Sequence, residues 1–282
     1  MSSARCSEIS RAAGESLAAT ATTAERWLLV EVRGGWPRDV GKSEALPDAA
    51  RDAVSAWLAG TPRSRLLFVR RPARGSGPSL AFVVDAPESG GSVRRFELET
   101  LDELVDADLV GGGDPVEARL VLVCAHGSRD TCCALRGTAV FGALAPGIGE
   151  EELWISSHQG GHRFAANVIV LPDAVQLGRL DPEEAPGVVS DALEGTIRLD
   201  RYRGRTCHDP VVQAAEHAVR SSAGLDRVGD LRLLDVSGST ARFAALDGVE
   251  FAVEVAGAEG LTLPVSCGAD PEPQPALSAR LL

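Results

Sequence analysis

The chain has 282 residues, 44% of them hydrophobic and 24% charged, which is the balance of a folded globular protein rather than a disordered one. It carries 40 Asp and Glu against 28 Lys and Arg, a formal net charge of −12, and only 4% of its residues are aromatic. This composition argues against nucleic acid as the main partner, because phosphates need a clustered basic surface and bases stack on aromatic rings. The length suggests about two domains.

The first part of the chain predicts a small α/β unit. Residues 27–32 form a short apolar run typical of a buried strand, and residues 43–58 place apolar side chains at helical spacing. Turns rich in Gly, Ser and Pro separate three further predicted strands at 65–71, 79–86 and 92–99. A stretch with three glycines and a proline at 111–117 is the predicted linker.

A second unit follows the linker. An apolar strand at 118–123 ends at Cys124, and after the loop CAHGSRDTCC the sequence predicts a helix near 134–145. The remaining predicted elements are a strand at 153–156, a helical turn at 163–167, paired strands at 168–172 and 175–180, and a helix from Asp181. The resulting order, β-α-β-α-β-β-α, is that of a thioredoxin-like fold.

We therefore expect an α/β protein with two thioredoxin-like units in tandem, followed by a C-terminal helix and β segments. The expected domains are a first thioredoxin-like domain at 1–114, a second at 115–205 and an extension at 206–282. In the extension, residues 209–224 predict an amphipathic helix, whereas the residues after Cys267 are expected to be frayed.

The six cysteines indicate metal or redox chemistry rather than a disulfide framework, because three of them fall within ten residues of one another. The first residues carry two glutamates and no continuous apolar core, so we expect no secretory signal. No run of about 18 apolar residues occurs, so no membrane span is expected. The prediction is a soluble cytoplasmic protein that does not bind membranes.

Two pairs of residues that can bind a metal follow neighbouring predicted strands. Cys124 and Cys133 are nine positions apart around a hydrophilic loop, and His158 and His162 are four apart around Gln159 and two glycines. Adjacent glycines let the backbone fold tightly past an inorganic group. Two thiolates and two imidazoles suit either zinc or an iron–sulfur cluster.

The segments CAHGSRDTCC and SSHQGGHRFAANVIVLPDAVQLGRL resemble the sucrase/ferredoxin-like family, whose hallmark is a Cys-x8-Cys pair and a later His-x-Gly-Gly-His. The resemblance extends roughly from Arg5 to Arg205. The second unit is also similar to thioredoxin-like [2Fe–2S] ferredoxins, except that histidines stand where those proteins have cysteines. The resemblance implies a [2Fe–2S] cluster bound by four residues: Cys124, Cys133, His158 and His162.

The histidine ligands would change the redox chemistry of such a cluster. Two thiolates with two neutral imidazoles carry less negative charge than four thiolates, so we predict a potential above that of all-cysteine ferredoxins. Rieske centres, at about −150 to +300 mV, are the comparison. Each histidine has a second ring nitrogen that can take up a proton on reduction, so the midpoint potential should depend on pH.

Several neighbouring residues are predicted to support the ligands: His126, Arg129, Arg163, Gly160 and Gly161. His126 can donate to the cluster or cap the loop. Arg129 can pair with Asp130 and Arg163 can face the charge of the cluster, with a solvated surface position as the alternative for each arginine.

The other cysteines and histidines have plainer expected roles. The motif spacing makes Cys132 an extra residue, although a ligand exchange or a vicinal disulfide with Cys133 is the alternative. We expect each of the remaining cysteines and histidines to be an isolated residue, either buried as a small apolar side chain or at the surface with its polar atoms satisfied: Cys6, Cys207, Cys267, His208 and His217.

Three functions compete on these residues. The first is a one-electron carrier or redox domain, with unidentified donor and acceptor proteins as partners, and the second is a Cys2His2 zinc protein. The third, a sugar hydrolase, needs a carboxylate pair that no local pattern marks, so no catalytic residue is assigned. Residues 20–110 are expected to form a cluster-free copy that mimics a missing partner, in a monomer or a homodimer.

Overall fold

The computed structural model describes residues 4–71 and 77–282, so the turn predicted between 71 and 79 lies mostly outside the described residues. The α-helices are α1 (Cys6–Ala12), α2 (Asp48–Gly60), α3 (Thr131–Leu144), α4 (Ala185–Leu193) and α5 (Pro210–Ala223). The 3-10 helices are η1 (Val40–Lys42), η2 (Leu101–Val105), η3 (His162–Phe164) and η4 (Val228–Asp230). None of the helices in these ranges is long and apolar enough to cross a membrane.

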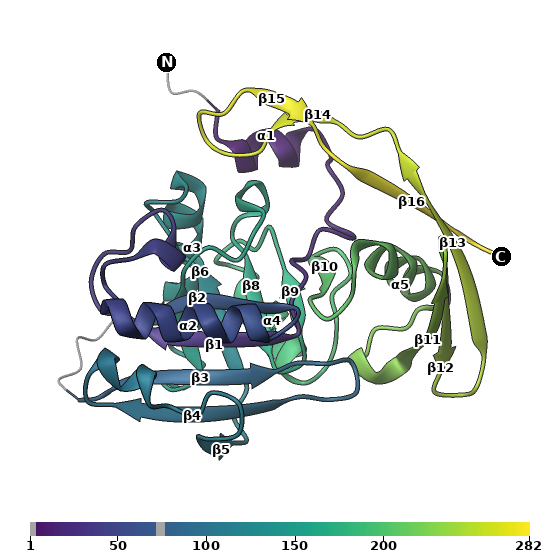
Figure 1. The fold of residues 1–282 in the computed structure, drawn as a ribbon. Helices are drawn as coiled ribbons and strands as arrows, with labels where there is room; N and C mark the ends of the chain where they lie inside the picture. Colours follow the sequence, from purple (N-terminus) through teal and green to yellow (C-terminus); the bar gives the residue numbers. More distant parts are fainter. Residues whose placement is uncertain (1–3, 72–76) are drawn as a thin grey trace.

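One mixed sheet runs through both expected thioredoxin-like units (Figure 1). In spatial order its strands are β10 (Tyr202–Arg205), β9 (Val175–Leu177), β8 (Val168–Leu171), β6 (Leu120–Cys124), β7 (Leu153–Ser156), β2 (Ser64–Arg70), β1 (Arg26–Glu31), β3 (Ser79–Asp85), β4 (Ser92–Leu98) and β5 (Asp114–Val116). β1 pairs with β2 in parallel, as β6 does with β7. The mixed α/β class predicted from the sequence is therefore confirmed.

The two expected units meet where β2 and β7 pair antiparallel. Val69 lies opposite Ser156 and Arg70 opposite Ile155, a ladder of only two residue pairs. Backbone hydrogen bonds thus join the two halves of the sheet, and the division into domains stays a prediction.

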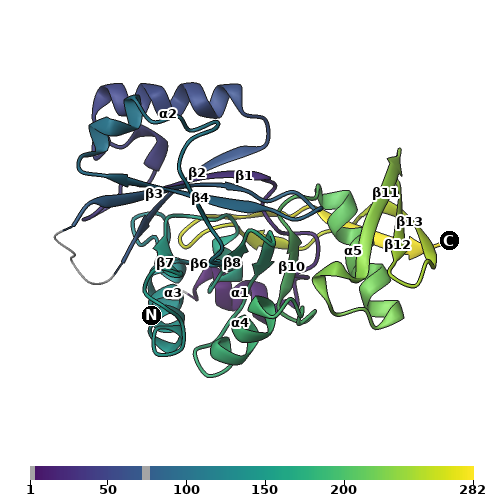
Figure 2. The ribbon, with the colours of Figure 1, turned by 90° about the horizontal axis from the view of Figure 1, so that it is seen from below.

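Three hydrophobic clusters arrange the sheet and the helices in layers. Along β1, Leu28 and Val30 pack toward α2, whereas Trp27 and Leu29 enter a second cluster shared with β6, β7 and β8. This alternation follows because successive side chains of a strand point to opposite faces. Figure 2 shows the result, with α2 outside the β1–β4 half and α3 and α4 outside the β6–β8 half.

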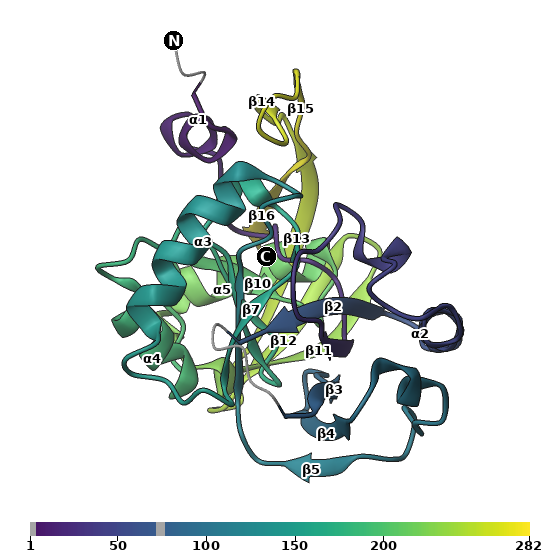
Figure 3. The same cartoon turned by 90° about the vertical axis from the view of Figure 1, so that its left-hand side faces the viewer.

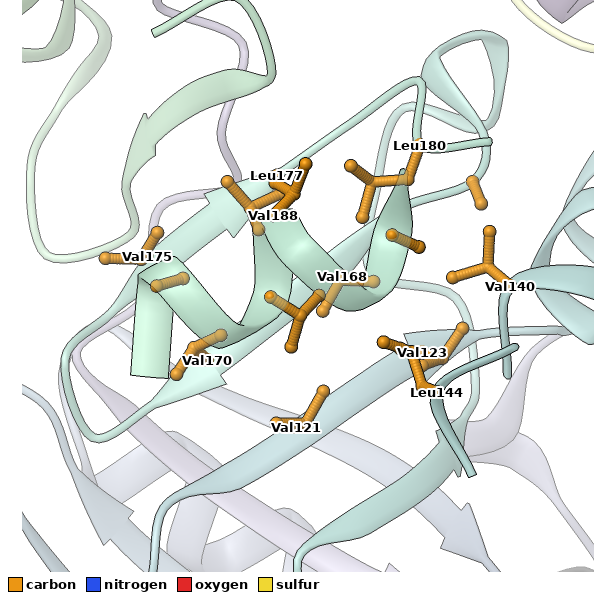
Figure 4. Close-up of a cluster of buried hydrophobic side chains, with 14 of the residues drawn as sticks. Val121, Val123, Val140, Leu144, Val168, Val170, Val175, Leu177, Leu180 and Val188 are labelled. Atoms are coloured by element: carbon orange, nitrogen blue, oxygen red, sulfur yellow. The ribbon is translucent and has the colours of Figure 1, made fainter. Parts of the chain in front are cut away.

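The third cluster lies between β6, β8, β9 and the helices α3 and α4 (Figure 4). Val121, Val123, Val168 and Val170 are fully buried there. Burying a side chain of this size contributes about 1.5–3 kcal/mol. This packing holds the ends of β6 and β7, where the sequence places the candidate ligands.

The helix predicted near 134–145 begins earlier, at Thr131. Asp130 caps it, since its carboxylate accepts the N–H of Cys132 at 2.7 Å. Cys132 and Cys133 therefore lie in the first turn of α3 rather than in the preceding loop.

The C-terminal extension forms a separate sheet against α5 (Figure 1). Its strands are β11 (Leu231–Ser237), β12 (Thr240–Ala245), β13 (Glu250–Ala258) and β16 (Ala276–Leu281), with β14 (Thr262–Pro264) and β15 (Pro271–Pro273) as a two-stranded ladder. The prediction of a frayed end after Cys267 is wrong. β16 exposes most of its side chains, so its sequence has little apolar pattern from which a strand could be predicted. Backbone pairing with β13 orders it instead.

Candidate metal centre

Cys124 and Cys133 come together because α3 packs tightly on the end of β6. Cys124 is the last residue of β6, Cys133 lies in the first turn of α3, and both are buried. Gly137, one turn further along α3, permits the contact. A Cβ at this position would lie only 2.0 Å from the carbonyl oxygen of Cys124.

The two sulfur atoms share a hydrogen bond. Donation from the Cys133 thiol, aided by His158 and by the N–H of Gln159, outweighs burial and holds the pKa of Cys124 well below its usual range. The same hydrogen bond raises the pKa of Cys133. The lowered pKa of Cys124 favours its thiolate, which is the form that binds metals.

His158 and His162 lie on the tight loop that follows β7, residues 158–162 (the histidine loop), and His162 is the first residue of η3. Gly160 and Gly161 have φ angles of 95° and 67°, in the left-handed region that favours glycine. A Cβ on Gly161 would lie 2.5 Å from Nη2 of Arg203, so this position also lacks room for a side chain. Both adjacent glycines are required for the loop to turn back on itself.

The four expected ligands gather in one place, three of them most closely. Cys124, Cys133 and His158 each offer one ligand atom within 4.8 Å of the others. His162 is outside that group, and its ring centroid lies 4.7 Å from that of His158. The Nδ1 atoms of both histidines are buried and have no hydrogen-bond partner among the described residues.

Burial, together with the neighbouring His158, lowers the pKa of His162 to about 4. His162 is therefore neutral at pH 7. A neutral imidazole keeps the lone pair that a metal ligand needs.

His126 supports the backbone of the histidine loop. Its Nδ1 accepts the N–H of His158 at 3.2 Å, and its Nε2 lies 2.9 Å from the carbonyl oxygen of Pro37. This pattern needs the proton on Nε2, and burial lowers the pKa of His126, which favours that neutral form. Of the two roles expected for His126, these contacts match the loop cap.

Three side chains, from the partly buried Arg65 and the buried Arg203 and Asn167, hold the carbonyl groups of the histidine loop. They donate to the carbonyl oxygens of His158, Gly160 and Gly161 at 2.9, 3.0 and 3.0 Å, respectively. Arg203 also donates to Oδ1 of Asn167 at 2.9 Å, and the Asn167 carbonyl accepts the N–H of Cys124 at 3.0 Å. These contacts connect the histidine loop to β6, the strand that ends at Cys124.

The two arginines that were expected from the sequence, Arg129 and Arg163, do not contact the histidine loop in this way. Arg163 forms an ion pair with Glu15 at 2.8 Å and stacks over the ring of Phe164. Arg129 forms no ion pair with Asp130 in the described structure, because the Asp130 carboxylate caps α3. The prediction of that pair is wrong.

Sequence reasoning missed the buried arginines and a second group of sulfur atoms. Cys6, Cys132 and Cys267 lie together with Asp130, so the expectation of isolated positions for Cys6 and Cys267 is wrong. Contacts between residues more than 120 positions apart leave no local pattern.

A protein-family model matches the part of the chain that holds these residues. The family model described as Sucrase/ferredoxin-like matches residues 17–204, which is most of the chain and includes the four expected ligands. No solved structure matches the chain significantly.

Among curated proteins, the chain is similar to fungal proteins named Altered inheritance of mitochondria protein 32. It is 30% identical to the one from Meyerozyma guilliermondii over 120 residues, which cover 39% of this chain and 43% of that protein. With the Clavispora lusitaniae protein it shares 34% over 100 residues, covering 33% and 37%. The matched region thus spans less than half the length of these relatives.

Proposed function

We propose that this chain, which belongs to the sucrase/ferredoxin-like family, is an electron-transfer protein that binds a [2Fe–2S] cluster through Cys124, Cys133, His158 and His162. The observation that carries the proposal is that, among the described residues, the Nδ1 atoms of His158 and His162 are buried without a hydrogen-bond partner, while His158 lies in one group of ligand atoms with both sulfurs. Buried polar atoms normally have hydrogen-bond partners. Two unpartnered nitrogen atoms in one place therefore suggest that these atoms bind a metal centre.

The donor set fits a cluster of this kind. Thiolate and neutral imidazole are the ligands of mixed Cys/His iron–sulfur centres, and such a centre accepts and returns one electron at a time. The low pKa of Cys124 and the neutral state of His162 leave both residues ready to bind. Zinc suits the same donors, so the test must separate the two metals.

The test is spectroscopic. We expect anaerobically purified protein to be red-brown, to contain two irons and two sulfides per chain, and to give an EPR signal on reduction. His158→Cys and His162→Cys should each change the visible and EPR spectra, because each replaces an imidazole ligand with a thiolate. His217→Cys, on α5 and away from the site, is the control and should change neither.

A colourless protein that contains zinc in place of iron would support the Cys2His2 zinc protein instead. Unchanged spectra in both histidine variants would show that the ligand set is wrong.

We also expect the midpoint potential to fall as pH rises. A ligand histidine has a second ring nitrogen, and reduction makes that nitrogen more basic, so electron uptake brings proton uptake. Voltammetry between about pH 6 and 9 measures this, and a flat potential would contradict the coupling.

The remaining parts of the proposal concern the setting of the site. The order β6-α3-β7-η3-β8-β9-α4 supports a thioredoxin-like unit at 115–205, with 1–114 as its cluster-free counterpart and 206–282 as an extension. Donor and acceptor proteins would be the partners, and a basic docking face would suit the net charge of −12. A reducing compartment such as the cytoplasm would keep the cysteines free.

A further inference from the structure

A second group of potential metal ligands lies beside the candidate cluster site. It brings together Cys6 from α1, Cys132 from α3 and Cys267 from the turn between β14 and β15. The Sγ atom of Cys132 lies 3.6 Å from that of Cys6 and 3.3 Å from that of Cys267, and the third sulfur–sulfur distance is 3.6 Å. Three sulfurs from three distant segments thus form a nearly equilateral triangle.

A carboxylate faces this triangle. Oδ1 of Asp130 lies 3.8 Å from the Cys6 sulfur and 3.4 Å from the Cys267 sulfur. All four ligand atoms lie within 4.8 Å of one another. Asp130 also accepts the N–H groups of Cys132 and Cys267 at 2.7 and 2.8 Å, which fixes the orientation of the carboxylate.

The distances match a tetrahedral zinc site. Zinc binds thiolate sulfur at about 2.3 Å and carboxylate oxygen at about 2.0–2.2 Å. A tetrahedron with these bonds places sulfurs about 3.8 Å from each other and about 3.5 Å from the oxygen. The observed separations need shifts of only a few tenths of an ångström.

The surroundings also suit a structural metal. Cys6, Cys132 and Asp130 are at most 5% exposed, and Cys267 is partly buried. The hydroxyl of Ser7 donates to the Cys132 sulfur at 3.2 Å, and Ser7 in turn accepts a hydrogen bond from Arg136. Hydrogen bonds to the ligating atoms stabilise metal sites.

We propose that Cys6, Cys132, Cys267 and Asp130 bind a zinc ion, separate from the cluster site and independent of the proposed function. The four donors match a closed structural site, which leaves no position for a substrate. Binding releases the protons of the thiols that are not already ionised.

The ion would fasten α1 and the β14–β15 turn to α3. α1 lies beside β14 and contacts it (Figure 3). It also packs on η3, which carries His162. Tying α1 and the β14–β15 turn to α3 would keep α1 packed on η3, next to the histidine loop. Because Cys132 and Cys133 are consecutive, one helical turn would serve both centres.

Zinc content of the full-length, anaerobically purified chain tests the proposal. We expect one zinc per chain, and a zinc-edge X-ray absorption spectrum with three sulfur neighbours at about 2.3 Å and one oxygen. The double variant His158→Ala/His162→Ala should keep this zinc, so that failure of the cluster proposal and failure of this one are distinguishable.

Cys267→Ser and Cys6→Ser should lower the zinc content at least tenfold. Cys207→Ser is the matched control, because Cys207 is buried but belongs to neither group, and it should keep the full content.

Three results would overturn the proposal. One is wild-type protein with less than a tenth of an equivalent of zinc. Another is zinc that persists in both Cys6→Ser and Cys267→Ser. The last is a disulfide between Cys132 and Cys267 found by mass spectrometry of the anaerobic protein. If Cys6→Ser does not fold, the number of sulfur neighbours in the wild-type absorption spectrum decides the question.

Discussion

Arg203 contacts several parts of the candidate site at once. Arg203 is 2% exposed, and among the described residues its guanidinium donates only to neutral groups, on Thr20, Gly160 and Asn167. Burial lowers the pKa of Arg203 to about 9, so the side chain is still a cation at pH 7. A buried cation without a paired carboxylate is costly unless negative charge lies close by. The thiolate of Cys124 supplies such charge, and its influence raises the pKa of Arg203.

We therefore predict that Arg203→Gln lowers both stability and midpoint potential. The carbonyl of Gly160 loses its donor, which costs about 1–3 kcal/mol when the group is buried. Removing a nearby positive charge also makes the reduced, more negative centre less favourable. Urea unfolding and voltammetry measure the two effects.

Arg198→Gln is the matched control, because Arg198 forms an exposed ion pair with Asp191. It should change stability by less than about 1 kcal/mol and leave the potential unchanged. Equal effects of the two substitutions would contradict a specific role for Arg203.

The candidate ligands could be picked out from the sequence because their spacing is local. Cys124 with Cys133, and His158 with His162, each lie within ten positions of one another and follow apolar strands. Arg65 and Arg203 were not predictable, because an arginine in a strand gives no sign of which distant carbonyl group it will meet.

At the scale of elements, the contact between α3 and β6 determines how close the two cysteines come. Gly137 lies at this contact, whereas Gly142 lies on the same helix with nothing within 4 Å of the position that a Cβ would take. The two glycines therefore offer a matched comparison within one helix.

We predict opposite outcomes for alanine at these positions. Gly137→Ala would push α3 away from the Cys124 carbonyl, at a cost of about 1–3 kcal/mol or more, and would reduce the iron content. Gly142→Ala should stabilise the protein by about 0.5–1 kcal/mol, because glycine is unfavourable inside helices. Urea unfolding and iron analysis of both variants measure this. Normal iron content in Gly137→Ala would show that the helix can shift without disturbing the site.

Elements with strong periodicity were predicted well, and those held by pairing alone were not. β1 and β7 agree with the predicted strands within one residue at each end, since their side chains are buried. β16 was missed because its exposed side chains carry no alternating pattern. The start of α3 was placed three residues late because Asp130 was not recognised as a cap.

At the scale of the whole molecule, segments far apart in the sequence meet around the two candidate sites. Arg65, from the first half of the sheet, donates to the carbonyl of His158, one of the proposed cluster ligands in the second half. Cys267, from the extension, lies with Cys6 and Cys132 in the separate group. The sequence predicted the α/β class and the region of the site, which depend on local patterns. It did not predict the joining of the two halves, because the β2–β7 ladder rests on two residue pairs with no distinctive side chains.

The central claim is that His158 and His162 bind the metal centre together with Cys124 and Cys133. Pulsed EPR of the reduced protein tests it most directly, with histidine alone labelled with ¹⁵N. The account predicts strong couplings from two nitrogens that change to the ¹⁵N pattern on labelling, and the loss of one of them in each of His158→Cys and His162→Cys. A reduced centre whose spectrum is the same with and without the label would contradict it.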